Sequence, residues 1–184
     1  MTWETIHPRT EPVFWHKAVW FKDHIPRHAF GCWVVARNRM HTRDRLISWG
    51  LSVSPLCLLC NAQHENRQHL FFDCAFTAEI WRSYVAAANL SPPTLFEDLL
   101  RWIVKPSNDK NLNRIMRLLF QATIYLIWKE RNTRLHDNTS RSPSSIKVVI
   151  NQLMRCKLDP LSRAQPNTPS TISLLTTWFT IFQP

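Results

Sequence analysis

Four residues near the middle of the chain have the spacing of ligands to one metal ion. Cys57, Cys60, His69 and Cys74 form the pattern C-x2-C-x8-H-x4-C. Two thiols two residues apart can hold one side of a tetrahedral ion, and a His and a third Cys that return after a polar loop can close the other side. Three thiolates and one imidazole are a structural zinc set, which leaves no position open for water or substrate. The pattern therefore predicts Zn²⁺ as a fold-holding cofactor and argues against metal-assisted hydrolysis.

Two alternatives to this ligand set stay open at the level of the sequence. Cys57 and Cys60 alone would also suit a redox C-x-x-C pair, but a redox pair leaves the spacing of His69 and Cys74 unexplained. His64 is the rival for the third position. It follows Cys60 so closely that the chain would have to return in a cramped turn, so we expect His69 to be the ligand.

The charge of the chain favours a polyanionic partner. Its 184 residues include 23 Lys and Arg against 13 Asp and Glu, which gives a net charge of +10. Nucleic acid is the first class of partner for such a balance, and an acidic membrane surface is the second. Only two Gly are present, which argues against a glycine-rich phosphate loop and against a sheet with many tight turns.

The sequence shows no sign of secretion or of membrane insertion. Five Cys are few and odd in number, which does not suit a secreted disulfide framework. The first ten residues lack the apolar run of a signal peptide. The most apolar stretch, residues 115–128, is too short to span a bilayer and contains Arg117. We therefore expect an intracellular protein, nuclear or cytoplasmic, without a membrane partner.

Apolar residues recur at helical spacing along most of the chain. Helices are expected after Phe14, from Pro26, from Thr42 to Gly50, over 76–85, after a capping box of Thr94 and Glu97, over 111–135 and from Pro143. The helix over 111–135 is apolar nearly all round, so it should be central and buried, with its charged end at 129–134 emerging into solvent. The same spacing assigns these residues to the core: Trp15, Trp20, Trp33, Trp49, Trp81, Cys32 and Cys156.

The sequence predicts an all-α fold, because no strand-like alternation of useful length is present. We expect a helical bundle with an inserted Cys3His zinc-binding loop that contains at most a small hairpin. Residues 1–13 are predicted to be a disordered N-terminus, 14–84 a zinc-binding domain and 85–158 a helical C-terminal extension. Residues 159–184 are rich in Pro, Ser and Thr and are predicted to be a poorly ordered tail, in which only the terminal apolar residues could dock.

The residues around the metal pattern form an ordered series. They are Pro26 to Phe30, Trp33, Arg37 to Arg39, Thr42 to Leu46, Trp49, Gly50, Cys57, Cys60, His69 to Cys74, Ile80 and Trp81. Over residues 14–84, their order, spacing and aromatic neighbours resemble the reverse transcriptase zinc-binding domain at the C-terminal end of plant LINE-type (non-LTR) retrotransposon polyproteins. The later segment 127–132 also looks like the helical segment that commonly follows. This resemblance implies zinc at the four ligands and a role in handling element RNA or target DNA.

The richest basic stretch lies before the metal loop, the segment from Pro55 to Cys74. Arg37, Arg39, Arg43 and Arg45 bracket a turn between two expected helices, so several guanidiniums can point to one side and bind phosphates. Arg67, inside the zinc loop, is a further candidate. We therefore expect RNA or DNA as the partner, bound through its phosphates. The alternative is a solvated helix face whose arginines have an intramolecular role, such as pairing with a nearby carboxylate.

The sequence does not predict catalysis. It contains no Tyr/Phe-x-Asp-Asp polymerase motif and no acidic cluster suited to the two metals of a nuclease. We therefore expect a non-catalytic zinc-binding and nucleic-acid-binding module without a small-molecule substrate. The alternative is a zinc-stabilised protein-interaction domain or a non-functional retroelement remnant.

Overall fold

A computed structural model describes residues 13–166 and 172–183 of the chain. Its elements are α2 (His16–Val19), α3 (Pro26–Ala36), α4 (Arg43–Ser48), the π-helix η1 (His69–Asp73), α5 (Ala75–Ala87), α6 (Phe96–Trp102), α7 (Lys110–His136), α8 (Pro143–Arg163) and α9 (Leu174–Phe182). The predicted all-α fold class is confirmed, since no strand occurs in these two ranges. The hairpin considered for the metal loop is reduced to one antiparallel bridge between Leu56 and His64. The predicted disordered segment 1–13 lies outside the described residues except for Val13.

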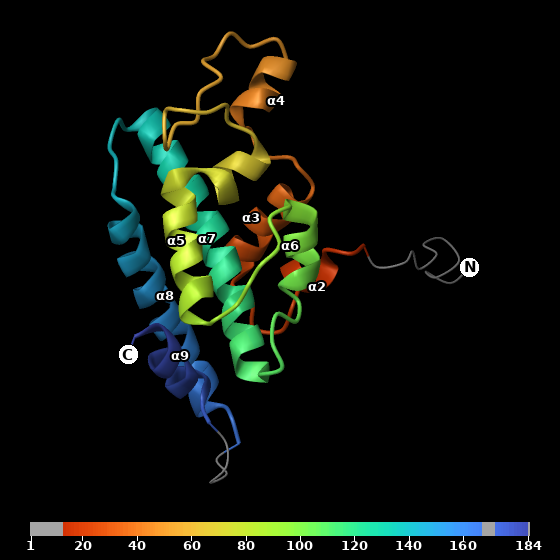
Figure 1. The fold of residues 1–184 in the computed structure, drawn as a ribbon, viewed down its shortest axis with the longest axis vertical. Coiled ribbons are helices and arrows are strands. Elements are labelled where there is room, and N and C mark those ends of the chain that lie inside the picture. The colour runs from red at the N-terminus through yellow and green to blue at the C-terminus, as the bar shows by residue number, and fades with distance from the viewer. Residues whose placement is uncertain (1–12, 167–171, 184) are drawn as a thin grey trace, which may run out of the picture.

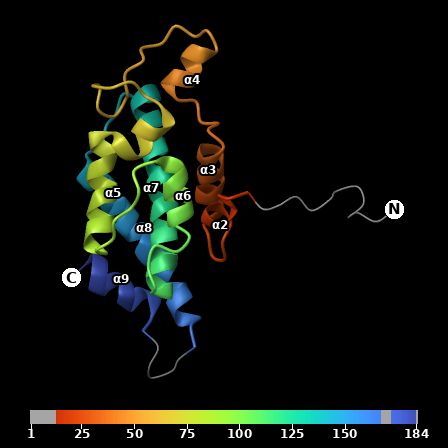
Figure 2. The same ribbon diagram turned by 45° about the vertical axis from the view of Figure 1, so that its right-hand side comes forward.

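Helix α7 is the axis of the bundle. Helices α3, α5, α8 and α9 all pack against it, and Figures 1 and 2 show α3 and α5 on different sides of it. Ile115, Leu119 and Ile127 are fully buried, so the predicted long and buried central helix is confirmed. Its end differs from the prediction, because Glu130 is 0% exposed and Arg131 only 2%. Arg131 pairs with Glu65 of the metal loop, and Glu130 pairs with Arg134 and Arg141.

Several helix ends follow the local signals of the sequence. Pro26 occupies the first turn of α3, and the Ser142 hydroxyl caps α8 by accepting the N–H of Ser145. Gly50 ends α4 with a φ of 82°, a conformation that glycine adopts without steric cost. Its N–H donates to Ile47 (2.9 Å), the first bond of the Schellman pattern at a helix end.

The predicted capping box before α6 is wrong. Helix α6 starts at Phe96, and the N–H of Phe96 donates to Oε1 of Gln68 (2.9 Å). The Glu97 carboxylate does not turn back onto its own helix but pairs with Arg67. Residues of the metal loop therefore provide the N-terminal contacts of α6, which a local sequence pattern does not reveal.

The prediction of a poorly ordered tail over 159–184 does not hold for most of its described residues. Helix α8 continues to Arg163. Helix α9 spans Leu174–Phe182, and its Trp178 is fully buried. The Trp178 ring stacks on Phe182 (4.8 Å between centroids) and lies near Tyr84 of α5 (6.4 Å). The Pro, Ser and Thr content concealed a short apolar helix whose burial against the bundle fixes it.

Two residues assigned to the core from their helical spacing lie at the surface. Trp49 is 52% exposed and Cys156 is exposed, whereas Trp81 and Cys32 are buried as predicted. Helix α4 contains no buried residue at all, because polar bonds rather than an apolar stripe hold it in place.

No element marks the predicted boundary at residue 84. Helix α5 runs through it, and Tyr84 and Val85 belong to the same hydrophobic core as α7. The division into a zinc-binding domain and a helical extension therefore stays a prediction. In the structure, residues of both parts belong to one hydrophobic core.

His28 makes the stability of this core depend on pH. Its ring is fully buried and stacks on Tyr125 (4.4 Å), and neither ring nitrogen has a hydrogen-bond partner among the described residues. Burial, and then the charge of Arg27, lower the pKa of His28 from 6.5 to about 4. The unfolded chain therefore binds this proton at a higher pH than the folded protein, so stability is lost as the pH falls from 6.5 toward 4.

The variant His28→Phe should remove this loss. A pKa difference of this size corresponds to about 3 kcal/mol of unfolding free energy between neutral pH and about pH 4. Urea unfolding of both proteins at several pH values measures it. The variant keeps the metal ligands, so acid release of a metal lowers both curves alike. If the free energies of unfolding of the two proteins depend on pH in the same way, the buried His28 does not cause the loss of stability in acid.

Candidate metal centre

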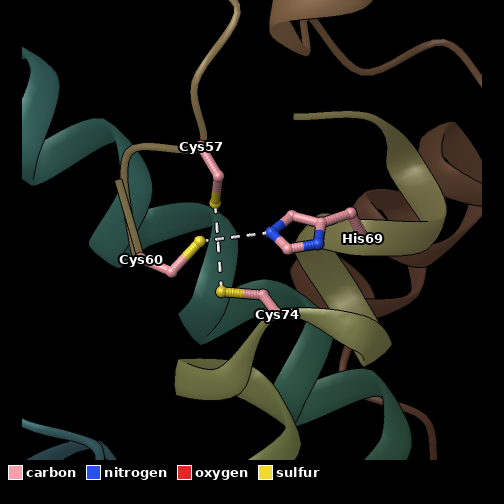
Figure 3. A group of neighbouring side chains, drawn as sticks. All are labelled: Cys57, Cys60, His69 and Cys74. Atoms are coloured by element: carbon pink, nitrogen blue, oxygen red, sulfur yellow. Dashed lines mark hydrogen bonds between the residues drawn. The ribbon is translucent and has the colours of Figure 1, made fainter. Parts of the chain in front are cut away.

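Four side chains converge where the metal loop meets η1 and the start of α5 (Figure 3). The ligand atoms of Cys57, Cys60, His69 and Cys74 all lie within 4.8 Å of one another. Sγ of Cys57 is 3.9 Å from Sγ of Cys74, and Sγ of Cys60 is 3.3 Å from Nε2 of His69. In a tetrahedral site with Zn–S bonds of about 2.3 Å, two sulfurs lie about 3.8 Å apart. The donor set and its spacing therefore fit a zinc ion.

The rival ligand His64 is not part of this group. Its side chain is exposed, and its backbone forms the bridge to Leu56. The structure thus places His64 at the rim of the loop and His69 among the thiols.

The first two thiols are brought together by a tight turn. The N–H of Leu59 points at Sγ of Cys57 (3.4 Å), and the N–H of Asn61 donates to the Cys57 carbonyl (2.8 Å). Asn61 has a φ of 51°, in the left-handed region that Asn tolerates better than most residues. This turn directs the side chains of Cys57 and Cys60 to the same point.

The other two ligands are brought together by the π-helix η1. The N–H of Cys74 donates to the carbonyl of His69 (2.7 Å), an i to i+5 bond that places residues five apart on neighbouring turns. The Asn66 side chain accepts the N–H of His69 (2.8 Å) and fixes where η1 begins. Leu70 and Phe71 are fully buried and anchor η1 in the core. The four residues between His69 and Cys74 in the sequence correspond to this π-helical turn. The helical periodicity of the sequence does not predict it.

The surroundings of Cys74 favour its thiolate form. It stands at the N-terminus of α5, and the Cys57 thiol donates to its sulfur, so the pKa of Cys74 lies below its ordinary value. Backbone N–H groups of Phe76 and Thr77 add to this effect. The same hydrogen bond between the two sulfur atoms, together with burial, raises the pKa of Cys57. A bound zinc ion would replace the shared proton, since zinc binds the deprotonated thiol.

The carboxylate of Glu65 clamps the metal loop onto the bundle. It is 0% exposed, and its Oε1 accepts the N–H of Arg43 at the start of α4 (3.0 Å) and Nη2 of Arg131 in α7 (3.0 Å). Its Oε2 accepts the N–H of Leu58 inside the loop (3.3 Å). One buried charge thus joins the loop, α4 and α7.

A second clamp lies one turn further along α7. Arg134 donates to the carbonyls of Leu58 (3.3 Å) and Leu59 (2.9 Å) in the metal loop. The buried carboxylate of Glu130 holds Arg134 (3.0 Å) and Arg141 (2.9 Å) in place. Sequence reasoning missed both clamps. The signals were the loop carboxylate Glu65 and the charged segment 129–134 at the end of α7.

Arg43 and Arg45, predicted as phosphate contacts, have intramolecular partners. Nη1 of Arg43 donates to the carbonyl of Ser54 (3.0 Å), and Nη1 of Arg45 to the carbonyl of Asn38 (2.7 Å). The Arg45 guanidinium also lies over the Trp49 ring (5.1 Å). These bonds tie α4 to the segments on either side of it and give both arginines an intramolecular role, while their contact with phosphate stays a prediction.

Arg67 also serves the fold. Its Nη1 donates to the carbonyls of Val35 and Ala36 (3.4 Å each), which end α3. Its guanidinium lies over the Phe96 ring (4.3 Å) and pairs with Glu97. Arg37 and Arg39 differ from these three arginines, because both are exposed and their guanidiniums form no hydrogen bond or ion pair with any residue in 13–166 or 172–183.

The part of the chain that contains the four ligands matches a known protein family. Residues 1–81 match the family described as zinc-binding in reverse transcriptase. The resemblance predicted from the sequence is thereby confirmed for the zinc-binding region, which is an accessory domain and not the catalytic polymerase domain. No curated protein and no solved structure matches the chain. The matched region ends within α5, whereas Arg131 and Arg134, which hold its metal loop, lie beyond it.

Among the described residues, no helix combines the length and the apolar character needed to cross a bilayer.

The zinc-binding region should bind one zinc ion per chain through the four clustered side chains. Cys60→Ser, Cys74→Ser and His69→Ala should each remove the metal, because a tetrahedral structural site uses every ligand. Elemental analysis of purified protein measures the content. His64→Ala is the matched control and should keep full occupancy. If His64→Ala loses the metal while His69→Ala keeps it, the ligand assignment is wrong.

Breaking the buried Glu65–Arg131 pair should destabilise the protein. Arg131→Met leaves the Glu65 carboxylate buried without its cation, which costs about 3–5 kcal/mol. Urea unfolding of the zinc-loaded protein measures the loss. Arg163→Met removes an exposed ion pair with Asp159 and should cost less than about 1 kcal/mol. Equal effects of the two variants would contradict a clamp at Glu65.

Proposed function

We propose that the chain is a zinc-stabilised, non-catalytic, nucleic-acid-binding module derived from a plant LINE-type (non-LTR) retrotransposon reverse transcriptase. The match of residues 1–81 to a zinc-binding region of reverse transcriptases carries this proposal. A Cys3His set leaves zinc no free coordination position, which supports a structural role for the metal rather than hydrolysis. The net charge of +10 supports RNA or DNA as the partner.

Arg37 and Arg39 are the phosphate contacts in this proposal. Both stand at the C-terminal end of α3, directly before the segment that leads to α4 and the metal loop. Their guanidiniums are exposed and not engaged by carboxylates of the described residues, so binding a phosphate would break no bond seen within them. The zinc centre contributes indirectly, because Arg67 of its loop bonds the carbonyls that precede these arginines.

One observation favours a second candidate, a protein-interaction domain. Helix α4 and the residue after Gly50 expose three large apolar side chains. These are Ile47 (42%), Trp49 (52%) and Leu51 (51%). A partner protein could cover them. The charge of the chain favours nucleic acid, and the salt dependence of binding separates the two candidates.

The proposed function predicts binding to RNA or DNA that weakens steeply with salt. Each phosphate contact contributes about 0.7–0.9 to the slope of log affinity against log salt. Arg37→Gln with Arg39→Gln should therefore weaken binding about equally across sequences and flatten the slope by about 1.5. Lys147→Gln with Lys157→Gln in α8 removes the same charge and should change the slope much less.

Fluorescence anisotropy with labelled RNA and DNA from low to physiological salt measures these slopes. If the two double variants behave alike, binding is diffuse charge attraction without a site. If the zinc-loaded protein binds neither RNA nor DNA, the protein-interaction candidate replaces the proposal.

A further inference from the structure

We propose that a groove between α3 and α7 binds single-stranded nucleic acid by stacking bases on its aromatic side chains. This inference rests on the proposed function and adds the form of the nucleic acid and the place where it binds. The groove includes the two exposed arginines and continues over aromatic side chains to which the sequence assigned no binding role.

The groove consists of three adjoining hollows. The central one, of about 320 Å³, is lined by Phe30 of α3 and by Tyr125 and Trp128 of α7. At one end Arg39 is shared with a hollow of about 170 Å³ beside Trp33. At the other end, Tyr125 and Trp128 are shared with a hollow of about 410 Å³ that follows α7 to its C-terminus. Helices α3 and α7 pack against each other, and both can be followed in Figure 2.

Phe30 is the exposed ring of the groove, whereas the rings of Trp33, Tyr125 and Trp128 are half-buried. Phe30 is 58% exposed, an unusual position for a Phe, and its ring lies 5.6 Å from that of Trp33. The Arg27 guanidinium lies over Tyr125 (5.4 Å) and that of Arg37 over Trp33 (5.4 Å). Stacking rings combined with arginines are the means by which proteins hold single strands without base-specific contacts. A duplex hides the faces of its bases, so it cannot use these rings.

Gly31 keeps the central hollow open. A Cβ at this position would lie 3.9 Å from Cδ2 of Tyr125, an ordinary contact, so a methyl group fits but a longer side chain would extend into the hollow. Glycine inside a helix costs about 1 kcal/mol relative to alanine.

The charges along the groove complement a phosphate backbone. Its cations are Arg27, Arg37, Arg39 and Lys129, and the acidic residue that lines it is Asp137 at the far end. None of these four cations forms an ion pair with a carboxylate in the described ranges. A strand that follows the groove would place its phosphates beside these cations and a base against the exposed ring of Phe30.

The test uses the zinc-loaded full chain and three labelled probes of equal length. They are an unstructured oligouridine RNA, a duplex RNA and an abasic phosphodiester strand. The wild-type protein should bind the oligouridine about tenfold more tightly than the other two, because only this probe offers unpaired bases. Phe30→Ala should lose about tenfold on the oligouridine and leave the abasic strand unchanged, and Phe30→Trp should restore binding.

Two further variants control for folding and for general aromatic contacts. Gly31→Leu fills the hollow without removing a core residue and should weaken oligouridine binding as Phe30→Ala does. Phe179→Ala removes another exposed aromatic that also has an arginine, Arg155, over its ring (5.5 Å), but on α9, and should change nothing.

Equal affinity of the wild-type protein for all three probes would overturn the inference and leave nucleic-acid binding in place. Binding to oligouridine that is indifferent to Phe30→Ala and Gly31→Leu would do the same. Absence of binding to every probe would overturn the proposed function and this inference together.

Discussion

The buried carboxylate of Glu65 is the interaction on which the arrangement of the metal centre depends. It bonds the first N–H of α4, an N–H between the first two thiols and the Arg131 guanidinium of α7. An unpaired charge at this depth would cost several kcal/mol, so the loop, α4 and α7 keep one relative position. Zinc closes the loop from inside, and Glu65 and Arg134 fix it to the bundle from outside. The two restraints act on the same few residues.

This arrangement joins two parts of the sequence that a family match separates. The matched region ends at residue 81, but the cations that hold its metal loop come from the end of α7. The zinc-binding region and the helices after it therefore form one structural unit. Helix α7 takes part twice, because its Arg131 holds the loop while Tyr125 and Trp128 line the groove against α3. The Arg131 guanidinium also lies over the Trp128 ring (5.1 Å).

The sequence was informative where one local rule determines the outcome. Ligand spacing predicted the group around Cys57, and periodicity predicted α7 nearly to its ends, because both depend on neighbours in the chain. It failed where distant residues decide. The N-terminus of α6 is capped by Gln68 rather than by its own box, and the arginines of α4 bond backbone carbonyls of the neighbouring segments. The π-helix η1 and the docking of Trp178 depend on burial in the finished core, which no local pattern encodes.

Hydrogen exchange with and without a zinc chelator tests the central claim most directly. The account predicts that chelation removes amide protection from residues 51–74 and from α4, because zinc and the Glu65 bonds hold these segments. The middle of α7 should stay protected, since its core contacts lie outside the metal loop. Loss of protection throughout the chain would show that the helical body has no stability without the metal. Unchanged protection of residues 51–74 would show that zinc does not hold the loop.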